Sequence, residues 1–256
     1  MRGVILAAGQ GVRLNGGQMD SPKCLVHIGG ETLLARNIRL LRDAGLDEVV
    51  VVIGCGAELV RRSCAGVRLV ENPLFASTNS LYSLWLAHPW LADGFVVMNC
   101  DVLLHPQLVT DLLSSRHEDA LLLAYADDDS AYGDEEMKVC VRRGRVVKIS
   151  KQLDPEEADG ENVGVAKFGA DGARVLMGEI DALVRAGDRR TWVPHAFQEF
   201  TRRRPLHAIG TRGLPWIEID FPEDYERAVA VVLPQIDPGP PGDARSDIRQ
   251  QIARSA

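Results

Sequence analysis

The stretch that decides the fold reads Leu6-Ala7-Ala8-Gly9-Gln10-Gly11-Val12-Arg13-Leu14, and Ser21-Pro22-Lys23-Cys24-Leu25 follows it. The apolar run at residues 4–8 is typical of a buried parallel strand. Glycines directly after such a strand let backbone N–H groups approach a phosphate, and Arg13 and Lys23 bring positive charge to the same loop. The stretch therefore predicts a phosphate-binding loop at the end of the first strand.

Two other phosphate-binding motifs fit this stretch less well. A dinucleotide fingerprint requires G-x-G-x-x-G, but Leu14 occupies the position of the third glycine. A Walker A loop requires G-x-x-x-x-G-K-[ST], and the chain contains no such string. The missing glycine and the Pro22-Lys23 element argue against a nicotinamide-dependent oxidoreductase.

The first 115 residues alternate between strand and helix patterns, which predicts an α/β fold with a parallel sheet covered on both faces. After the first strand, further strands are expected at 48–53, 67–70 and 95–100. Helices are expected at 32–44, 78–87 and 106–115. The five consecutive β-branched residues at 49–53 indicate a strand that is buried.

The middle of the chain has a different pattern, with short strands separated by turns. Strands are expected at 120–125, 137–142, 146–150 and 163–168, and they predict an antiparallel extension or lid at about 120–170. Helices at 170–185 and 195–203, a strand at 216–220 and a helix at 223–233 complete one domain over residues 1–236. The Pro- and Gly-rich run after Ile236 predicts a C-terminal tail at 237–256.

The composition narrows the class of protein. The chain has 256 residues, 46% of them hydrophobic and 25% charged, which is ordinary for a globular protein. A formal net charge of -7 does not favour a nucleic-acid partner. Five cysteines without a C-x-x-C pair argue against a disulfide framework or a zinc site. With no apolar run of about 20 residues and no leader pattern, no membrane partner and a cytoplasmic location are expected.

The motifs together resemble the signature of the sugar-nucleotide pyrophosphorylase and cytidylyltransferase superfamily, over about residues 2–233. Asn72-Pro73 and the T-N-S-L-Y-S-L string at 78–84 resemble its phosphocholine cytidylyltransferase-like branch. Asn99-Cys100-Asp101-Val102 resembles the family segment in which an aspartate follows a strand. Many relatives have glycine before that aspartate, where this chain has Asn99-Cys100. The E-N-V-G string at 161–164 and W-I-E-I-D at 216–220 resemble its later substrate and metal segments.

The resemblance implies a Rossmann-like, mostly parallel sheet of the GT-A-like nucleotidyltransferase type, and a magnesium-dependent transfer of a nucleoside monophosphate. A substrate phosphate attacks the α-phosphorus and pyrophosphate leaves. Because the second pKa of a phosphate monoester is about 6, the nucleophile is already ionised near neutral pH and needs no general base. Asp101 and Asp220 are expected to hold Mg²⁺, since each ends a predicted strand, where open α/β sheets bind ligands. Lys23 and Arg13 are expected to contact the triphosphate.

The resemblance also assigns the remaining contacts. The nucleotide is expected to meet Leu6, Ala7, Ala8, Gly9, Gly11, Thr78, Asn79 and Ser80. Lys151 is expected to face the acceptor's phosphate and Glu161 its organic part. Trp192 and Trp216 are candidates for the acceptor pocket, where an aromatic pair would suit a quaternary ammonium group through cation–π attraction.

The leading hypothesis is transfer of CMP from CTP to a small phosphorylated alcohol or a phosphonate, such as a phosphocholine-like compound, a polyol phosphate or an aminoalkylphosphonate. The alternative is a sugar-1-phosphate nucleotidyltransferase that uses UTP, GTP or dTTP. A non-catalytic relative is disfavoured because Arg13, Lys23, Asp101 and Asp220 are all present. The resemblance also allows a homodimer, although no interface is evident.

Overall fold

The computed structural model describes residues 1–11, 13–14, 22–126 and 132–237. Val12 and Ser21 of the loop motif lie outside the described residues, and so does the predicted tail from residue 238 onward. Within the described part of the chain, no helix is both long enough and apolar enough for a membrane span.

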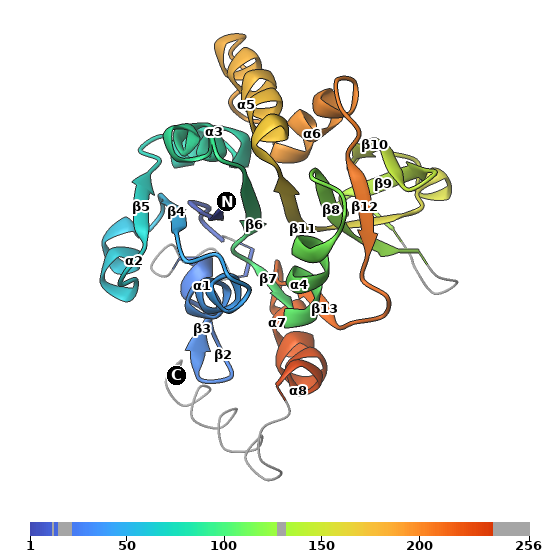
Figure 1. Ribbon diagram of the computed structural model, residues 1–256. Helices are drawn as coiled ribbons and strands as arrows, with labels where there is room; N and C mark the ends of the chain where they lie inside the picture. Colours follow the sequence, from blue (N-terminus) through green and yellow to red (C-terminus); the bar gives the residue numbers. More distant parts are fainter. Residues whose placement is uncertain (12, 15–21, 127–131, 238–256) are drawn as a thin grey trace.

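A mixed sheet runs through the centre of the molecule, and the described residues contribute nine strands to it in the order β5-β4-β1-β6-β11-β8-β12-β10-β9 (Figure 1). The first four strands are parallel, and we call them the parallel half. They are β5 (Arg68–Glu71), β4 (Val49–Ile53), β1 (Arg2–Ala7) and β6 (Phe95–Asn99).

The other five strands, which we call the mixed half, pair mainly antiparallel. They are β11 (Gly160–Phe168), β8 (Ala120–Tyr125), β12 (His207–Gly210), β10 (Arg145–Ser150) and β9 (Lys138–Arg142). β11 joins the two halves, because it pairs antiparallel with β6 on one side and with β8 on the other. The antiparallel extension predicted at 120–170 is thus a continuation of the central sheet.

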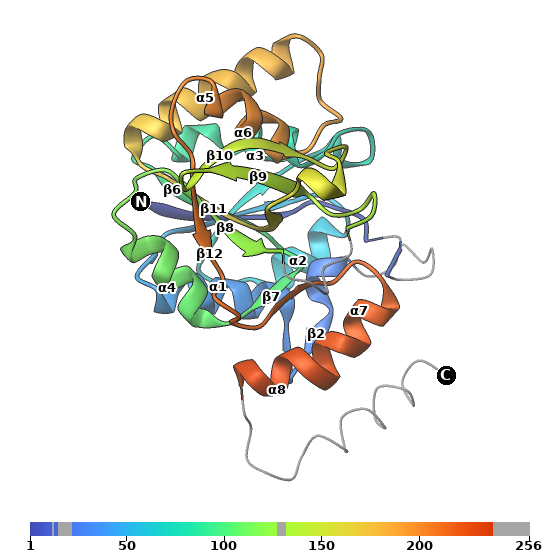
Figure 2. The same cartoon turned by 90° about the vertical axis from the view of Figure 1, so that its right-hand side faces the viewer.

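Helices cover both faces of the sheet, as Figures 1 and 2 show. On one face lie α3 (Ser80–Leu86), α5 (Ala170–Arg185) and α6 (Val193–Thr201), and on the other α1 (Leu33–Asp43), α2 (Ala57–Ser63) and α4 (Pro106–Ser114). β1 shows why two cores form: Val4 and Leu6 belong to the first, whereas Ile5 and Ala7 belong to the second. Successive side chains of a strand point to opposite faces.

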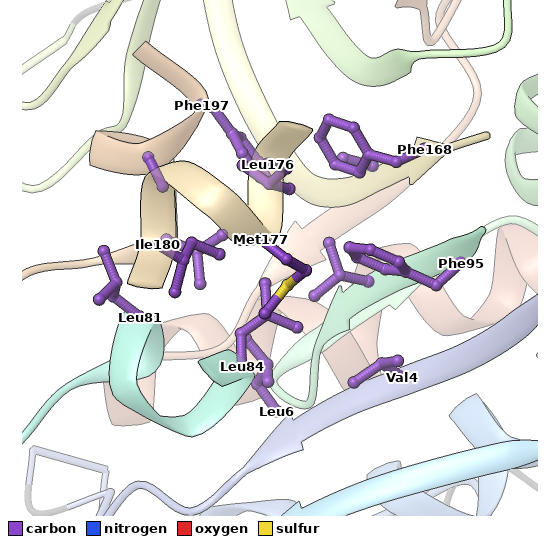
Figure 3. Close-up of a cluster of buried hydrophobic side chains, with 14 of the residues drawn as sticks. Val4, Leu6, Leu81, Leu84, Phe95, Phe168, Leu176, Met177, Ile180 and Phe197 are labelled. Carbon is purple, nitrogen blue, oxygen red and sulfur yellow. The ribbon is translucent and has the colours of Figure 1, made fainter. Parts of the chain in front are cut away.

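The first core, between the sheet and α3, α5 and α6, contains an aromatic group at the junction of the two halves (Figure 3). The ring of Phe168 on β11 lies 5.5 Å from that of Phe95 on β6 and 5.2 Å from those of Phe197 and Phe200 on α6. All four side chains are buried. Such aromatic contacts add to the stabilisation that burial provides.

A third, smaller core lies below the main sheet and carries the C-terminal part of the described chain. There β7 (Val102–Leu104) pairs antiparallel with β13 (Trp216–Glu218) in a separate two-stranded sheet. The short hairpin β2 (His27–Ile28) and β3 (Glu31–Thr32) packs nearby. The predicted last helix is α7 (Pro222–Arg227), continued by a π-helical turn (Ala228–Val232) and α8 (Leu233–Ile236).

Several of these elements differ from the sequence prediction. The strand predicted at 216–220 ends at Glu218 and pairs with β7 instead of joining the nine-stranded sheet. The short elements β2, β3, β7, β12 and α2 were not predicted. Most of them have two to four residues, which is too few for a hydrophobic period to be recognised.

Candidate active site

A cleft of about 360 Å³ opens where β1 and β6 end, between these strands and the start of α3. It lies at the carboxyl ends of parallel strands, the usual ligand position in open α/β sheets. Most of the residues predicted to bind substrates line this cleft: Leu6, Ala8, Gly9, Gly11, Arg13, Lys23, Thr78, Asn79, Ser80, Asp101, Lys151, Trp192 and Asp220.

Lys23 lies at the centre of the cleft. It starts a 3₁₀ turn (Lys23–Leu25), and its Nζ donates to Asp101 Oδ2 at 2.7 Å and to Asp220 Oδ1. Burial alone would lower the pKa of Lys23, which is 7% exposed, but the two carboxylates outweigh burial and raise the pKa. The ammonium is therefore charged throughout the physiological range.

Gly11 allows this lysine to approach the loop. Its φ is +62°, a conformation that L side chains rarely adopt, and a Cβ there would lie 2.5 Å from the Cβ of Lys23. Replacement of Gly11 would therefore displace either the loop or the lysine. This is a local reason why the motif has glycine at this position.

Three carboxylates gather around the Lys23 ammonium. Oxygens of Asp101, Glu218 and Asp220 lie within 4.8 Å of one another. Asp101 follows β6, Glu218 ends β13 and Asp220 follows it, and the N–H of Ile219 donates to the carbonyl of Asp101 at 3.0 Å. The short β7–β13 ladder thus brings together acids that are more than 100 positions apart in the sequence.

The sequence prediction did not include Glu218 in this group. The sequence feature that could have revealed Glu218 is the alternation E-I-D at 218–220. It places Glu218 and Asp220 on the same face, while Ile217 and Ile219 enter the third core. Burial first, and then the neighbouring Asp101 and Asp220, raise the pKa of Glu218 to about 8. A cluster of acids this close is favourable only with positive charge nearby.

The acid cluster fits a divalent cation. Asp101 Oδ1 is buried and has no hydrogen-bond partner, which is unusual for a carboxylate oxygen. Carboxylate oxygens are the ligands that Mg²⁺ prefers, and one or two of them commonly hold it together with substrate phosphates. Asp101 and Asp220 would hold the ion, with Glu218 beside them.

Arg13 connects the glycine loop to the mixed half. Its guanidinium donates to Asp220 Oδ2 at 2.9 Å and to Glu135 Oε2 at 2.7 Å, and it lies 4.8 Å above the ring of Phe221. Lys151 Nζ donates to the same Glu135 oxygen at 3.1 Å. These hydrogen bonds from Arg13 and Lys151 lower the pKa of Glu135. The prediction did not include Glu135, because it stands in an acidic run, D-E-E at 134–136, that reads as an exposed loop.

Polar side chains at the start of α3 form the wall of the cleft opposite the acids. Buried Asn72 donates from Nδ2 to Thr78 Oγ1 and Ser83 Oγ, both at 3.1 Å. Asn79 caps the helix, its Oδ1 accepting from the N–H of Ser80 at 2.7 Å. Their hydrogen bonds hold these residues in fixed positions beside the space that a nucleotide would fill.

The family follows from a comparison with known proteins. The model of the MobA-like NTP transferase domain matches residues 3–210. The chain belongs to this family. The predicted nucleotidyltransferase superfamily is thereby confirmed.

The names of individual relatives agree with this family assignment. The bifunctional IPC transferase and DIPP synthase of Rubrobacter xylanophilus is 31% identical over 236 residues, which are 90% of this chain and 51% of that protein. The choline-phosphate cytidylyltransferase of Streptococcus pneumoniae is 30% identical over 185 residues, 64% of this chain and 80% of that protein. This chain spans about half the length of the bifunctional IPC transferase and DIPP synthase relatives that it matches.

A solved structure confirms the predicted α/β nucleotidyltransferase fold. The CTP:phosphocholine cytidylyltransferase of Streptococcus pneumoniae superimposes with a TM-score of 0.73 at 25% sequence identity. The match covers 88% of this chain and 96% of that one.

Three residues that were expected from the sequence to contact the substrates lie outside the cleft lining. Glu161 is on β11 opposite Lys138 of β9, outside the cleft lining, and burial together with Glu136 raises its pKa to about 7. The side chain of Ala7 enters the second core. Trp216 packs against the second core from β13 and is outside the cleft lining, so its contact with the acceptor stays a prediction that the geometry of the cleft does not support.

Proposed function

We propose that this chain transfers CMP from CTP to a small phosphorylated alcohol or phosphonate and releases pyrophosphate, with magnesium as cofactor. One observation carries the proposal: Lys23, Arg13, Asp101 and Asp220 meet in one cleft beside the glycine loop, and Lys23 bridges both aspartates. Two anionic substrates can be brought together only where positive charge is concentrated.

Each group in the cleft has a role in such a transfer. The loop at Gly9 and Gly11 receives the triphosphate, and Arg13 neutralises charge on the leaving pyrophosphate. Lys23, held between the two aspartates, presents a fixed positive charge to the α-phosphate, where negative charge develops in the transition state. When bound by Asp101 and Asp220, Mg²⁺ supplies further charge neutralisation and orients the phosphates.

The acceptor's own phosphate serves as the nucleophile. It is ionised near neutral pH, so the residues position it rather than deprotonate it. Lys151 lines the cleft next to Trp192 and shares Glu135 with Arg13, and this position supports a role in binding the acceptor's phosphate. The name cytidylyltransferase, carried by both the pneumococcal relative and the pneumococcal solved structure described above, supports CTP as the nucleotide.

A pyrophosphate-release assay tests the proposal. The purified chain is incubated with Mg²⁺, one of CTP, UTP, GTP or dTTP, and a panel of alcohol phosphates, phosphonates and sugar 1-phosphates. We expect release with CTP that depends on an alcohol phosphate or phosphonate. Preference for another nucleotide with a sugar 1-phosphate would favour the sugar-nucleotide alternative, and no acceptor-dependent release with any pair would refute both.

The variant Lys23→Met tests the role of the bridging lysine in the same assay. Because the variant keeps the volume of the side chain but removes the bridging charge, we expect turnover to fall about 10²- to 10³-fold. Lys148→Met, at an exposed lysine on β10 that pairs with Glu157, is the matched control and should keep full turnover. Equal turnover of both variants would contradict the role of Lys23.

A further inference from the structure

We propose that the acceptor carries a neutral, hydroxyl-bearing organic group, as in a polyol phosphate, and no fixed positive charge, because Lys151 already occupies the aromatic face that a cationic group would use. The inference rests on the proposed cytidylyl transfer and deepens it. It concerns the end of the cleft formed by Lys151, Trp192 and Glu135.

Lys151 is held from two sides. Its Nζ lies 5.2 Å from the centroid of the Trp192 ring and 3.1 Å from Glu135 Oε2. The face of an aromatic ring attracts a cation through its electrostatic quadrupole, whether the cation belongs to a side chain or to a ligand. The Lys151 ammonium therefore takes the place on Trp192 that a quaternary or primary ammonium of an acceptor would need.

The position of Trp192 is fixed by the chain around it. The N–H of the next residue, Val193, donates to Ser80 Oγ at 3.0 Å, and the N–H of Leu81 donates to the carbonyl of Thr191 at 3.4 Å. These bonds tie the residues on both sides of the tryptophan to the start of α3. Trp192 is 47% exposed and lines the cleft, where Lys151 lies over its ring.

Among the described residues, the carboxylate that is hydrogen-bonded to Lys151 and the two aspartates of the cleft are already paired with cationic side chains. The carboxylate that reaches Lys151 is that of Glu135, and Arg13 and Lys151 already share it. Asp101 and Asp220 are paired with Lys23, and Asp220 also with Arg13. An ammonium brought to Trp192 would meet the Lys151 charge, whereas a phosphate is attracted to it and a hydroxyl group is tolerated.

The contacts of Lys151 also indicate where the phosphate and the organic part of the acceptor would lie. Lys151 can turn its hydrogen-bond donors toward the acceptor's phosphate while its stem stays on the indole, because lysine has a flexible four-carbon stem. The organic part then lies next to the Lys151 ammonium and Glu135, and the face of Trp192 stays covered by the lysine stem. A polyol suits this position, since its hydroxyl groups can donate to the carboxylate without bringing a net charge.

A competition between acceptors tests the proposal. With CTP and Mg²⁺, kcat/KM is measured for glycerol phosphate and inositol phosphate, which have neutral organic parts, and for phosphocholine and 3-aminopropylphosphonate, which carry a cation. We expect at least one neutral acceptor to exceed both cationic ones by about tenfold or more. Preference for a cationic acceptor would overturn the inference but leave the cytidylyl transfer intact, whereas no product with any acceptor would refute the proposed function itself.

Substitutions at Lys151 separate its effect on specificity from its effect on the phosphate. Lys151→Met should lower kcat/KM for every acceptor, but it should also shift the ratio between neutral and cationic acceptors about tenfold toward phosphocholine, because the aromatic face becomes free. Lys151→Arg keeps the charge and should keep the wild-type ratio. Lys148→Met is the matched control with an unchanged ratio. An unchanged ratio in Lys151→Met, in a variant with a wild-type circular dichroism spectrum, would overturn the role of Lys151.

Discussion

The parallel half and the mixed half of the sheet supply different parts of the site, and they differ in regularity. The parallel strands pair without any register shift, and the loops after β1 and β6 carry the glycines and Asp101. The mixed half contains register shifts in β10 and in β11, and it supplies Lys151 and Glu135. Shifts of this kind change the direction in which side chains point. Of the groups expected to serve nucleotide transfer, the glycines and Asp101 thus follow strands of the regular half and Asp220 follows the separate strand β13, whereas Lys151 and Glu135 belong to the irregular half.

The largest effect is expected at the parallel half. Asp101→Asn keeps the size of the side chain but removes a charge that Lys23 and the expected Mg²⁺ both require. Turnover should fall about 10³-fold or more, as for the loss of a group that acts mainly in the transition state. Single-turnover measurements with CTP and a preferred acceptor check this.

Asp43→Asn, at an exposed aspartate at the end of α1, is the matched control and should keep normal turnover. If Asp101→Asn retained wild-type turnover with a normal fold, the parallel half would not carry the chemistry, and the division between the halves would fail.

The second effect concerns the junction of the two halves. Phe168→Ala removes the ring that β11 packs against Phe95 of β6 and against α6, and we expect it to lower the free energy of unfolding by about 3–5 kcal/mol. Urea unfolding followed by circular dichroism measures the change. Leu59→Ala, at an exposed residue of α2, is the control and should change stability by less than about 1 kcal/mol. A small effect of Phe168→Ala would mean that the halves are joined elsewhere.

The smallest effect lies inside the mixed half, at Glu161. Burial, aided by Glu136 and opposed by Lys138 and Lys151, raises the pKa of this carboxyl from 4.5 to about 7. Between these values the folded chain binds the proton more tightly than the unfolded chain, so this group makes the protein less stable as pH rises from about 4.5 to 7.

Glu161→Gln should therefore be more stable than the wild type at pH 8 by about 1–2 kcal/mol, and the difference should shrink toward pH 5. Thermal or urea unfolding at the two pH values measures it. The exposed Glu58→Gln on α2 should show no such pH-dependent gain. A gain for Glu161→Gln that is equal at both pH values would contradict the raised pKa.

The two halves also differ in how well the sequence predicts them. Asp101 and the glycine loop follow long buried strands, so the end of each strand fixes where the polar group must lie. All strands of the mixed half except β12 were predicted too, but their order was not, because pairing between distant segments leaves no local pattern. The insertion of β11 between β6 and β8 is the main example.

Individual site residues were missed, or lie away from the cleft lining, for physical reasons. Trp216 was expected in the pocket because tryptophan suits both a core and a ligand wall, and the sequence does not say which face of β13 is covered. Glu218 was missed because a single acid in an apolar strand can have a structural or a functional role. Only its neighbours in the folded chain decide between the two. Glu135 was missed because its partners, Arg13 and Lys151, are 122 and 16 positions away.

The β7–β13 ladder has a consequence for how such enzymes diversify. Asp101, Glu218 and Asp220 are kept in register by a two-stranded unit with its own apolar support, outside the nine-stranded sheet. Changes in the strands of the mixed half can therefore leave the spacing of these three acids intact. A designer who wants a new product would begin by exchanging residues 132–151 and leave the ladder untouched.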